Sequence, residues 1–463
     1  MNLTNVKYVY FLGIGGIGMS AIARYFKHIG LQVYGYDKTE TPLTQKLLAE
    51  GMFIHYTDDP VSLSSLPINT QNTLVVLTPA IPKDHQELAW FKAHHYTILK
   101  RAEVLGVLSE SSVTIGVAGT HGKTTTSTLL AHLLIQSKIK CNAFLGGIAS
   151  NYESNLLLHP LADTLPIGQQ FTVVEADEFD RSFLSLSPYY AIITSTDADH
   201  LDIYGEHSAM QESFLAFANK LRAGGTLLVK YNLDIIPKLS GQFLSYGLNS
   251  SAQIFAYNIR INEAEHIFDL MIEGKSIQDL SLGIPGLHNI ENAVAASAVA
   301  LLCGISEEEL RAGLSSFKGV KRRFEYRIKT TDQIFIDDYA HHPEEIKAIL
   351  GSIKRMYPHK KLVVAFQPHL YSRTRDFLDE FAHSLSLADS VYILPIYPAR
   401  ELPIPGINSE LLVEKIETKD KKLVGKQELV EAIVSLKPTL FVSLGAGDID
   451  ALVQPIEDGL LGK

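Results

Sequence analysis

The sequence predicts an α/β protein built from three successive domains, and three observations predict this fold class. A glycine-rich turn follows a buried strand twice, at residues 13–18 and 116–122. Beyond about residue 319, short apolar runs alternate with helical stretches. Strands that alternate with helical patterns are typical of parallel sheets covered by helices. We expect the domains to span residues 1–107, 108–318 and 319–463.

Composition excludes several classes of protein. The chain has 463 residues, of which 46% are hydrophobic and 20% charged, as in globular proteins with ample cores. A net charge of −10 and the lack of a basic run argue against nucleic-acid binding. No apolar run is long enough to cross a membrane, so we expect a cytoplasmic protein without a membrane partner. Cys141 and Cys303 lie far apart and are interpreted as small buried side chains.

The first glycine turn belongs to a strand–turn–helix–strand unit. Residues 6–12 form an apolar run, Gly-Ile-Gly-Gly-Ile-Gly follows at 13–18, and helical and strand patterns continue over 19–29 and 32–36. Asp37 then stands about 20 residues beyond the glycines, which is the layout of a Rossmann-like dinucleotide fold. The motif predicts binding of a nucleotide diphosphate but does not specify NAD.

The second glycine turn is a variant P-loop. A strand at 113–115 leads into Gly119-Thr120-His121-Gly122-Lys123-Thr124-Thr125, and an apolar helical pattern follows. Backbone N–H groups of such a loop surround phosphate oxygens, Lys123 can reach the β- and γ-phosphates, and the Thr124 hydroxyl can bind Mg²⁺. The spacing departs from the common motif, since five residues separate Gly116 from Gly122. The alternative is a glycine turn capped by threonines. We predict a P-loop ATPase-like domain.

Acidic clusters follow the next two predicted strands, at 171–176 and 191–194. The first is Glu175-Ala176-Asp177-Glu178-Phe179-Asp180, and the second, Asp197 to Asp202, contains His200. Carboxylates suit Mg²⁺, and a histidine between acids can hold a second metal ion. The alternatives are a solvated acidic turn and an ordinary surface histidine. Because parallel strands end at one edge of a sheet, we expect these clusters to lie near the P-loop.

Two polar groups around the start of the third domain leave alternatives open. Asn289 and Asn292 precede or open an alanine-rich helix predicted at 292–302. Their amides suit an adenine edge, but Asn289 could equally cap the helix. Arg323, in Lys-Arg-Arg-Phe-Glu, could stabilise a transferring phosphoryl group or belong to a charged linker.

The third domain carries two further clusters at strand ends. The first is Asp337-Asp338-Tyr339-Ala340-His341-His342-Pro343, in which His341 is a candidate base or substrate-orienting group. The alternative is a metal site on the paired histidines. Pro343 is predicted to start a helix. Phe366-Gln367-Pro368-His369-Leu370-Tyr371-Ser372-Arg373-Thr374-Arg375 offers Arg373 for a carboxylate. Arg375 is interpreted as an exposed helical residue. The proline-rich stretch at 395–407 is predicted to be a loop.

Together these blocks resemble the Mur ligase family of peptidoglycan synthesis. The resemblance spans nearly the whole chain and its motifs occur in family order. They are Gly-Ile-Gly-Gly-Ile-Gly-Met, Gly-Thr-His-Gly-Lys-Thr-Thr-Thr, Asp-Ala-Asp-His-Leu-Asp, Gly-Leu-His-Asn-Ile-Glu-Asn-Ala, Arg-Arg-Phe-Glu, Asp-Asp-Tyr-Ala-His-His-Pro and Phe-Gln-Pro-His. The family implies an N-terminal Rossmann-like domain for a UDP-sugar, a central P-loop ATPase-like domain and a C-terminal Rossmann-like domain for an amino acid.

The resemblance is strongest to the branch that joins L-alanine to UDP-N-acetylmuramate. It implies attack of the lactyl carboxylate on the γ-phosphate of ATP, which gives ADP and an acyl phosphate. The amine of L-alanine then attacks the carbonyl and phosphate leaves. ATP and two Mg²⁺ sites are implied, with Mn²⁺ as an alternative metal. Domain closure on substrates is expected to keep water from the acyl phosphate.

The resemblance also implies roles for individual residues. Those of the UDP-sugar site are Gly15, Gly16, Ile17, Gly18, Asp37 and His369. Those of the ATP site are Gly119, Thr120, Gly122, Lys123, Thr124, Thr125, Asn289, Asn292, Arg323 and Asp338. Metal ligands are Thr124 and Glu178 for one ion and His200 for the second. The amino-acid site is Tyr339, His341 and Arg373, and the catalytic residues are Lys123, His341 and Arg373.

Two departures from the family pattern stand out. Many relatives carry a carbamylated lysine about 15 residues after the metal-binding histidine, whereas Leu215 stands near this position and the next lysine is Lys220. The same feature is found in the alanine branch. Many members of that branch also have an arginine where Leu370 stands. Without this arginine, Arg373 is expected to make a larger contribution to binding the alanine carboxylate.

Three alternatives remain. A recycling ligase that attaches a preformed tripeptide to UDP-N-acetylmuramate shares the early motifs but differs around residues 366–373. An NAD-dependent oxidoreductase would explain the first glycine turn and Asp37, but neither the P-loop nor the acidic clusters. A non-catalytic nucleotide-binding regulator would leave the histidine and acid clusters unexplained. The chain is expected to act on small molecules as a monomer or a homodimer.

Overall fold

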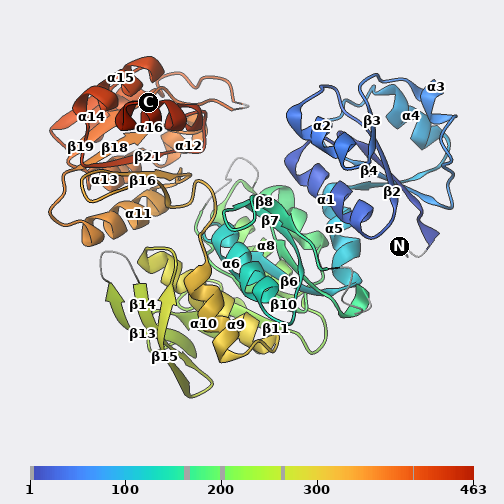
Figure 1. Ribbon diagram of the computed structural model, residues 1–463, viewed down its shortest axis with the longest axis horizontal. Helices are drawn as coiled ribbons and strands as arrows, with labels where there is room; N and C mark the ends of the chain where they lie inside the picture. The colour runs from blue at the N-terminus through green and yellow to red at the C-terminus, as the bar shows by residue number, and fades with distance from the viewer. Residues whose placement is uncertain (1–4, 161–166, 199–203, 262–265, 400) are drawn as a thin grey trace. The chain divides into compact units, whose positions relative to one another are not determined.

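The computed structural model describes residues 5–160, 167–198, 204–261, 266–399 and 401–463 (Figure 1). Residue contacts divide the chain into two compact units, and both are discontinuous in sequence. The first unit comprises residues 1–146, 154–245 and 299–306, and the second comprises residues 147–153, 246–298 and 307–463. Within the described ranges, no helix has the length and apolarity needed to cross a membrane.

The first unit begins with a five-stranded parallel sheet. Its strands are β1 (Tyr8–Leu12), β2 (Gln32–Tyr36), β3 (Phe53–His55), β4 (Thr73–Leu77) and β5 (Thr97–Lys100), in the order β3-β2-β1-β4-β5. The sequence predicted β2 with these bounds, and β1 within two residues. The first crossover helix, α1 (Ile17–His28), begins two residues earlier than expected.

Helices cover both faces of this sheet, because residues along each strand alternate between two cores. Val9 and Phe11 of β1 face a core that includes buried residues of α1, α2 (Pro42–Ala49) and α5 (Arg101–Glu110). Tyr10 and Leu12 face a second core with α3 (Pro60–Leu63) and α4 (Gln86–Ala93). Burial of both faces is typical of parallel sheets. Because all five strands are parallel, their carboxyl ends lie at one edge of the sheet.

A buried hydrogen-bonded triad lies in the second of these cores. The Tyr10 hydroxyl is 2.6 Å from Glu87 Oε2 and 2.6 Å from His55 Nε2, and Glu87 is fully buried. His55 Nδ1 lies 2.9 Å from the Thr57 carbonyl, so this nitrogen must donate. To satisfy both 2.6 Å contacts, one further proton must therefore be shared, either on Glu87 or on His55 Nε2. Burial, the largest cause, raises the pKa of Glu87 to about 7, and the nearby charges of Asp58 and Asp59 add to this effect.

We expect the stability of this sheet to fall as pH rises from about 4.5 to about 7. Burial lowers the pKa of His55, so the proton of the triad resides on Glu87. The folded state retains this proton in this range whereas an unfolded Glu87 does not, and linkage predicts a loss of about 3 kcal/mol. Glu87→Gln should remove this slope. Urea unfolding at several pH values can be followed by the fluorescence of the chain's one tryptophan, Trp90, which lies in α4.

The matched control is Glu50→Gln, because Glu50 lies in the same domain and forms a partly exposed pair with Arg24. This variant should keep the wild-type slope. If Glu87→Gln also kept it, the buried proton would not reside on the triad. His85, which contacts Asp58 at 3.2 Å, is a further buried titratable group in this region.

The P-loop strand β6 (Val113–Ala118) lies at the centre of the first unit's second sheet. It pairs in parallel with β9 (Phe171–Glu175) on one side and β10 (Tyr190–Ile193) on the other. β11 (Thr226–Lys230) follows β10, and β7 (Asn142–Ala149, whose last three residues belong to the second unit) and β8 (Ser154–Leu157) follow β9. Thus three strand ends meet beside the P-loop, as expected from the sequence. Almost every residue of α6 (Lys123–Gln136) is buried.

The second unit contains an antiparallel sheet that the sequence analysis did not predict. Its strands are β13 (Ile254–Ile261), β14 (His266–Ile272) and β15 (Lys275–Leu282). Strand β12 (Leu244–Gly247) and helix α9 (Leu287–Leu302) each begin in one unit and end in the other. Helix α10 (Glu307–Ser316) packs against β15.

The C-terminal part of the second unit is a six-stranded sheet in the order β16-β17-β21-β18-β19-β20. Its strands are β16 (Glu325–Lys329), β17 (Ile334–Asp338), β18 (Leu362–Phe366), β19 (Ser390–Ile393), β20 (Asp420–Leu423) and β21 (Leu440–Leu444), and only β16 is antiparallel. One face packs against α11 (Pro343–Met356), α13 (Leu378–Leu385) and α14 (Ser409–Lys415), and the other against α15 (Lys426–Leu436) and α16 (Asp450–Leu461). The alternation of strands and helices predicted beyond residue 319 and the start of α11 at Pro343 are confirmed.

A short segment, residues 147–153, binds the linker that precedes the C-terminal sheet. Ser150 N donates to the Gly319 carbonyl at 3.0 Å and Lys321 N donates to the Ile148 carbonyl at 2.9 Å. The Asn151 side chain donates to the Ser316 carbonyl at 2.9 Å and accepts from Lys318 N at 2.8 Å. This segment therefore serves as a strand-like partner for residues 316–321.

Candidate nucleotide and amino-acid sites

The P-loop has the strand–turn–helix structure that its sequence predicts. β6 ends at Ala118 and α6 begins at Lys123. Gly119 and Gly122 have φ values of 139° and 82°, which favour glycine. A Cβ atom at Gly119 would lie 2.1 Å from Thr194 Oγ1, so only glycine fits between β6 and the end of β10.

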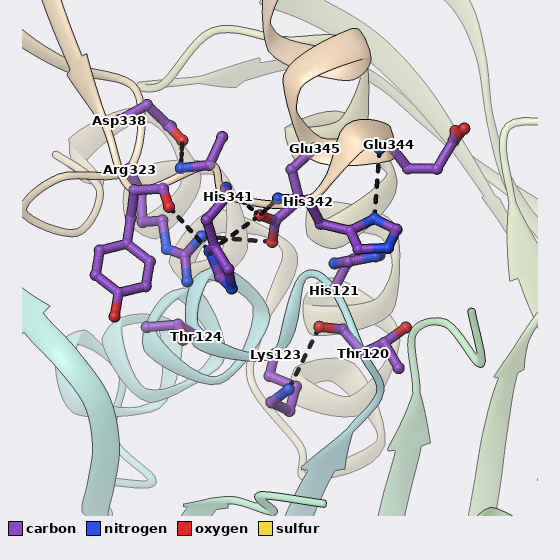
Figure 2. Close-up of polar contacts among 12 residues, drawn as sticks. Thr120, His121, Lys123, Thr124, Arg323, Asp338, His341, His342, Glu344 and Glu345 are labelled. Atoms are coloured by element: carbon purple, nitrogen blue, oxygen red, sulfur yellow. Dashed lines mark hydrogen bonds and ion pairs between the residues drawn. The ribbon is translucent and has the colours of Figure 1, made fainter. Parts of the chain in front are cut away.

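Lys123 is buried and bound within the loop rather than extended into solvent. Its Nζ donates to the Gly119 carbonyl at 2.6 Å and to Glu178 at 2.8 Å. The Thr120 carbonyl is 3.5 Å from Nζ, and Figure 2 shows this contact. Burial alone would lower the pKa of Lys123, but the carboxylates of Glu178, Asp177 and Glu175 outweigh this effect and raise it. Lys123 therefore stays protonated, and a nucleotide phosphate can compete with Glu178 for its ammonium group.

Two carboxylates lie beside the P-loop, one buried and one partly buried, and the partly buried one was not among the individually predicted site residues. Glu178 is 1% exposed. Glu175, the last residue of β9, accepts from Thr124 Oγ1 at 2.9 Å and from Gly146 N at 2.8 Å. Burial raises the pKa of Glu175, although Lys123 and these hydrogen bonds oppose the shift. Its position as the final residue of a strand next to β6 is the signal that could have identified it.

The oxygen atoms of Thr124, Glu175 and Glu178 are the kind of donors that Mg²⁺ prefers. Each lies within the first unit and is held by the P-loop helix or by the end of β9. No group of three or more histidine, cysteine or acidic side chains suited to a metal ion occurs within the ranges that the structure covers. The predicted ligand His200 lies outside the described residues.

The first glycine turn is stabilised by Asp37. Its Oδ2 accepts from Gly15 N at 2.7 Å and its Oδ1 accepts from Thr39 N at 3.2 Å. A Cβ atom at Gly18 would lie 2.1 Å from Arg101 Nη1, so the guanidinium approaches the turn closely. Gly16 directly precedes α1, and Ile17, its first residue, is 68% exposed. The structure thus brings together Asp37 and the glycine turn, as the sequence predicted.

In the second unit, Asn289 and Asn292 lie inside α9 rather than before it. The helix begins at Leu287, five residues earlier than expected, so the alternative in which Asn289 caps this helix is excluded. Asn289 Nδ2 donates to the Pro285 carbonyl, and Asn292 Nδ2 is 3.5 Å from Asn289 Oδ1. Both side chains are buried and share one helical face.

Asp338 organises the turn that contains the paired histidines. Its two oxygen atoms accept from Phe324 N at 2.6 Å and Ala340 N at 2.7 Å. Burial raises the pKa of Asp338 to about 6, although the charge of Arg323 and these hydrogen bonds oppose the shift. The guanidinium of Arg323 lies 5.0 Å from the Tyr339 ring centre. Asp338, Tyr339 and Arg323, predicted separately, therefore form one cluster.

The adjacent histidines have different structural roles. His341 Nδ1 donates to the Tyr339 carbonyl at 3.0 Å and is 3.4 Å from Glu345 (Figure 2). His342 is buried, and its Nδ1 accepts from Glu344 N at 3.4 Å as the N-cap of α11. This difference argues against a metal site on the pair.

Arg373 is nearly fully buried in α12 (Tyr371–Asp376) beside His369. Its Nη1 is 3.5 Å from His369 Nδ1. Leu370, before the helix, has a φ of 71°, and its N–H donates to the Tyr397 carbonyl at 3.0 Å. Arg375, by contrast, has a side chain that is 51% exposed and pairs with Asp376, as predicted.

The predicted loop at 395–407 supports this arginine segment. Tyr397 stacks on His369, with ring centres 5.7 Å apart. Glu401 accepts from the Ser372 N–H at 3.0 Å and from its hydroxyl, at the start of α12. Neither Tyr397 nor Glu401 was identified from the sequence, because their contacts join residues that lie about 28 positions apart along the chain.

The two glycine turns and the buried lysine beside carboxylates define a nucleotide-phosphate-binding protein of the α/β class. Three family models match the chain in order. The model described as "Mur ligase family, catalytic domain" matches residues 8–112, "Mur ligase middle domain" matches residues 117–300, and "Mur ligase, glutamate ligase domain" matches residues 322–446. The chain belongs to the Mur ligase family.

Individual relatives match over almost the full length. A UDP-N-acetylmuramate–L-alanine ligase from Parabacteroides distasonis is 48% identical over 460 residues, with 99% of this chain and 98% of the relative covered. The solved structure of a UDP-N-acetylmuramate–alanine ligase from Thermotoga maritima is 27% identical, with a TM-score of 0.75 and coverage of 98% and 99%. A murein peptide ligase structure from Psychrobacter arcticus shares the fold at 22% identity, with a TM-score of 0.66 and 98% of both chains covered.

Proposed function

We propose that this protein joins L-alanine to the lactyl carboxylate of UDP-N-acetylmuramate at the expense of ATP, as a step in peptidoglycan precursor synthesis. The observation that carries the proposal is the 48% identity to an L-alanine ligase over 460 residues, which includes the P-loop lysine and its acidic neighbours in this chain. The tripeptide-recycling ligase is less favoured, since the murein peptide ligase is similar at only 22% identity. No comparison favours the NAD-dependent alternative.

The first chemical step is transfer of the γ-phosphoryl group of ATP to the sugar carboxylate. Lys123 would neutralise phosphate charge and release Glu178 as it does so. Thr124 and Glu178 would hold one Mg²⁺ ion, Glu175 is positioned to assist, and we retain His200 for a second ion, with Mn²⁺ as an alternative metal. The metal would supply charge neutralisation at the phosphates.

The resemblance supports further residues for the ATP site. Those of the P-loop are Gly119, Thr120, Gly122, Lys123, Thr124 and Thr125, and those from other motifs of the family are Asn289, Asn292, Arg323 and Asp338. The buried amides of Asn289 and Asn292 offer donor and acceptor atoms for the adenine edge. The cationic group of Arg323 is held near Tyr339 and is available to compensate phosphate charge.

The second step is attack of the alanine amine on the acyl phosphate. Arg373 would bind the alanine carboxylate, and Tyr339 would contribute to the same site. His341 can accept a proton from the amine, because its Nδ1 is fixed as a donor and Nε2 is then the basic atom. Gly15, Gly16, Ile17, Gly18, Asp37 and His369 are proposed for the UDP-sugar.

The remaining proposals concern organisation. We propose functional domains at residues 1–107 for the UDP-sugar, 108–318 for ATP and metal, and 319–463 for the amino acid. The protein would act in the cytoplasm, on small molecules, as a monomer or a homodimer, without nucleic-acid or membrane partners.

Phosphate release tests the proposal directly. The assay contains ATP, Mg²⁺ and UDP-N-acetylmuramate, with L-alanine, with the tripeptide L-alanyl-γ-D-glutamyl-diaminopimelate, or with neither. We expect release that requires both the sugar nucleotide and L-alanine, and that stops when EDTA removes the metal. Release with the tripeptide alone would assign the recycling reaction instead. Absence of release together with NADH turnover would support the oxidoreductase.

A further inference from the structure

The hydroxyl group of Ser195 is bonded to the P-loop at several points, although Ser195 belongs to none of the predicted sites. It lies two residues beyond the end of β10 and is 5% exposed. Its Oγ is 2.6 Å from His121 N, 2.8 Å from Thr120 Oγ1 and 3.3 Å from the His121 carbonyl. The Ser195 carbonyl also accepts from Thr120 N at 3.3 Å. One serine thus contacts both central residues of the loop.

The directions of these hydrogen bonds can be assigned by counting donors. Asp197 N donates to Thr120 Oγ1 at 3.1 Å, which leaves the Thr120 hydroxyl free to donate to Ser195 Oγ. Ser195 Oγ then accepts from Thr120 and from His121 N, and its own proton points to the His121 carbonyl. All acceptor and donor capacity of the Ser195 hydroxyl is used, and every bond goes to the loop.

The neighbouring residue strengthens the same contact. The Thr194 hydroxyl lies within hydrogen-bond distance of two carbonyl oxygens, that of His121 and, at 3.1 Å, that of Ala118, and its single proton is shared between them. Thr194 N donates to the Ala118 carbonyl at 2.9 Å. The loop between β6 and α6 is therefore held from one side by backbone and side chains of the chain segment that continues β10.

We propose that Ser195 is a positioning residue for ATP, which sets the path of the loop at Thr120 and His121 before the phosphates bind. This inference rests on the proposed function in that ATP is taken as the ligand. A phosphate-binding loop holds its ligand through backbone N–H groups that point toward the phosphate oxygens. If the loop is already ordered before ATP binds, no binding free energy is lost in ordering it. Ser195 touches neither ATP nor metal in this proposal and acts through the loop.

Ser195→Ala tests the role, with ATP binding measured by calorimetry in the absence of the other substrates. Loss of the oxygen leaves the buried Thr120 hydroxyl and His121 N–H without their acceptor, so we expect the Kd for ATP to rise about tenfold or more. In the ligation assay, KM for ATP should rise in parallel, whereas KM for L-alanine should stay within about twofold. Ser195→Thr, which keeps the oxygen, should restore ATP affinity.

Ser109→Ala is the matched control. Ser109 is also fully buried in the first unit, and its hydroxyl accepts from Ser187 N at 3.0 Å and donates to the Gly106 carbonyl at 2.6 Å. This variant should lose similar thermal stability but keep the wild-type Kd for ATP. If Ser195→Ala does not fold, Ser195→Cys replaces it, since sulfur is a weak acceptor and the same rise is expected.

The outcomes separate this inference from the proposed function. Wild-type affinity for ATP in a folded Ser195→Ala or Ser195→Cys protein would overturn the positioning role, as would an equal loss of affinity in Ser109→Ala. A wild-type protein that binds ATP but does not consume it with UDP-N-acetylmuramate and L-alanine would contradict the proposed function and leave the binding comparison valid.

Discussion

Lys123→Met should lower kcat/KM for ATP-dependent ligation by about 100- to 1,000-fold, the scale found when one group that stabilises transition-state charge is removed. Methionine keeps most of the length of the side chain but has no charge to offer the transferring phosphoryl group. Steady-state phosphate release, with ATP varied at saturating UDP-N-acetylmuramate and L-alanine, measures the effect. Lys220→Met, at an exposed lysine of the same unit, should retain wild-type activity.

The ion pair between Lys123 and Glu178 complicates the single variant, because removal of one buried partner leaves the other charge uncompensated. The destabilisation expected from this is about 3–5 kcal/mol. The double variant Lys123→Met/Glu178→Gln removes both charges and should recover most of the thermal stability without recovering activity. If the double variant recovered activity as well, the lysine would have a structural role only.

Arg373→Ala should raise KM for L-alanine by about 100-fold or more, because loss of one partner from a buried charge-assisted pair costs about 2–5 kcal/mol. Arg373 is 6% exposed, so bulk water cannot readily replace its guanidinium at the bound carboxylate. KM for ATP should change by less than about threefold. The measurement is phosphate release with L-alanine varied over several orders of magnitude.

Arg375→Ala is a close control, since it lies on the same short helix and removes the same charge. Its guanidinium is bonded to Asp376 and half-exposed, so its loss should leave KM for L-alanine within about twofold of wild type. A similar rise in both variants would mean that the net positive charge of α12 matters rather than the position of Arg373. An unchanged KM in Arg373→Ala would exclude Arg373 as the carboxylate-binding group.

The features that could be predicted from the sequence are those set by local patterns. The P-loop, its flanking β6 and α6, and the start of α11 at Pro343 follow from glycine and proline constraints and from apolar periodicity. The convergence of β6, β9 and β10 also followed, because parallel strands must end at one edge. The strongest site prediction, Lys123 beside an acidic cluster, rests on this geometry.

Features that depend on distant contacts could not be predicted. The pairing of Tyr10 with Glu87 joins residues 77 positions apart, and nothing in either local pattern indicates it. Glu175 lies among other acids in the sequence, and only its contacts with Thr124 and Gly146 at the end of β9 distinguish it from the other acids of this cluster. The start of α9 was misplaced since the predicted helix was read from its alanine-rich part, whereas the first turn is polar and includes Asn289.

The pairing of residues 147–153 with the 316–321 linker limits how the protein can be divided into fragments for separate expression. The chain passes between the two units five times, so no single cut yields either unit as one continuous polypeptide. A fragment that begins at residue 319 would lack the backbone of residues 148–150, so the Gly319 carbonyl and the Lys321 N–H would lose their hydrogen-bond partners. Independent expression of the C-terminal sheet would therefore require the short segment to be supplied as a separate peptide or joined to the fragment by a linker.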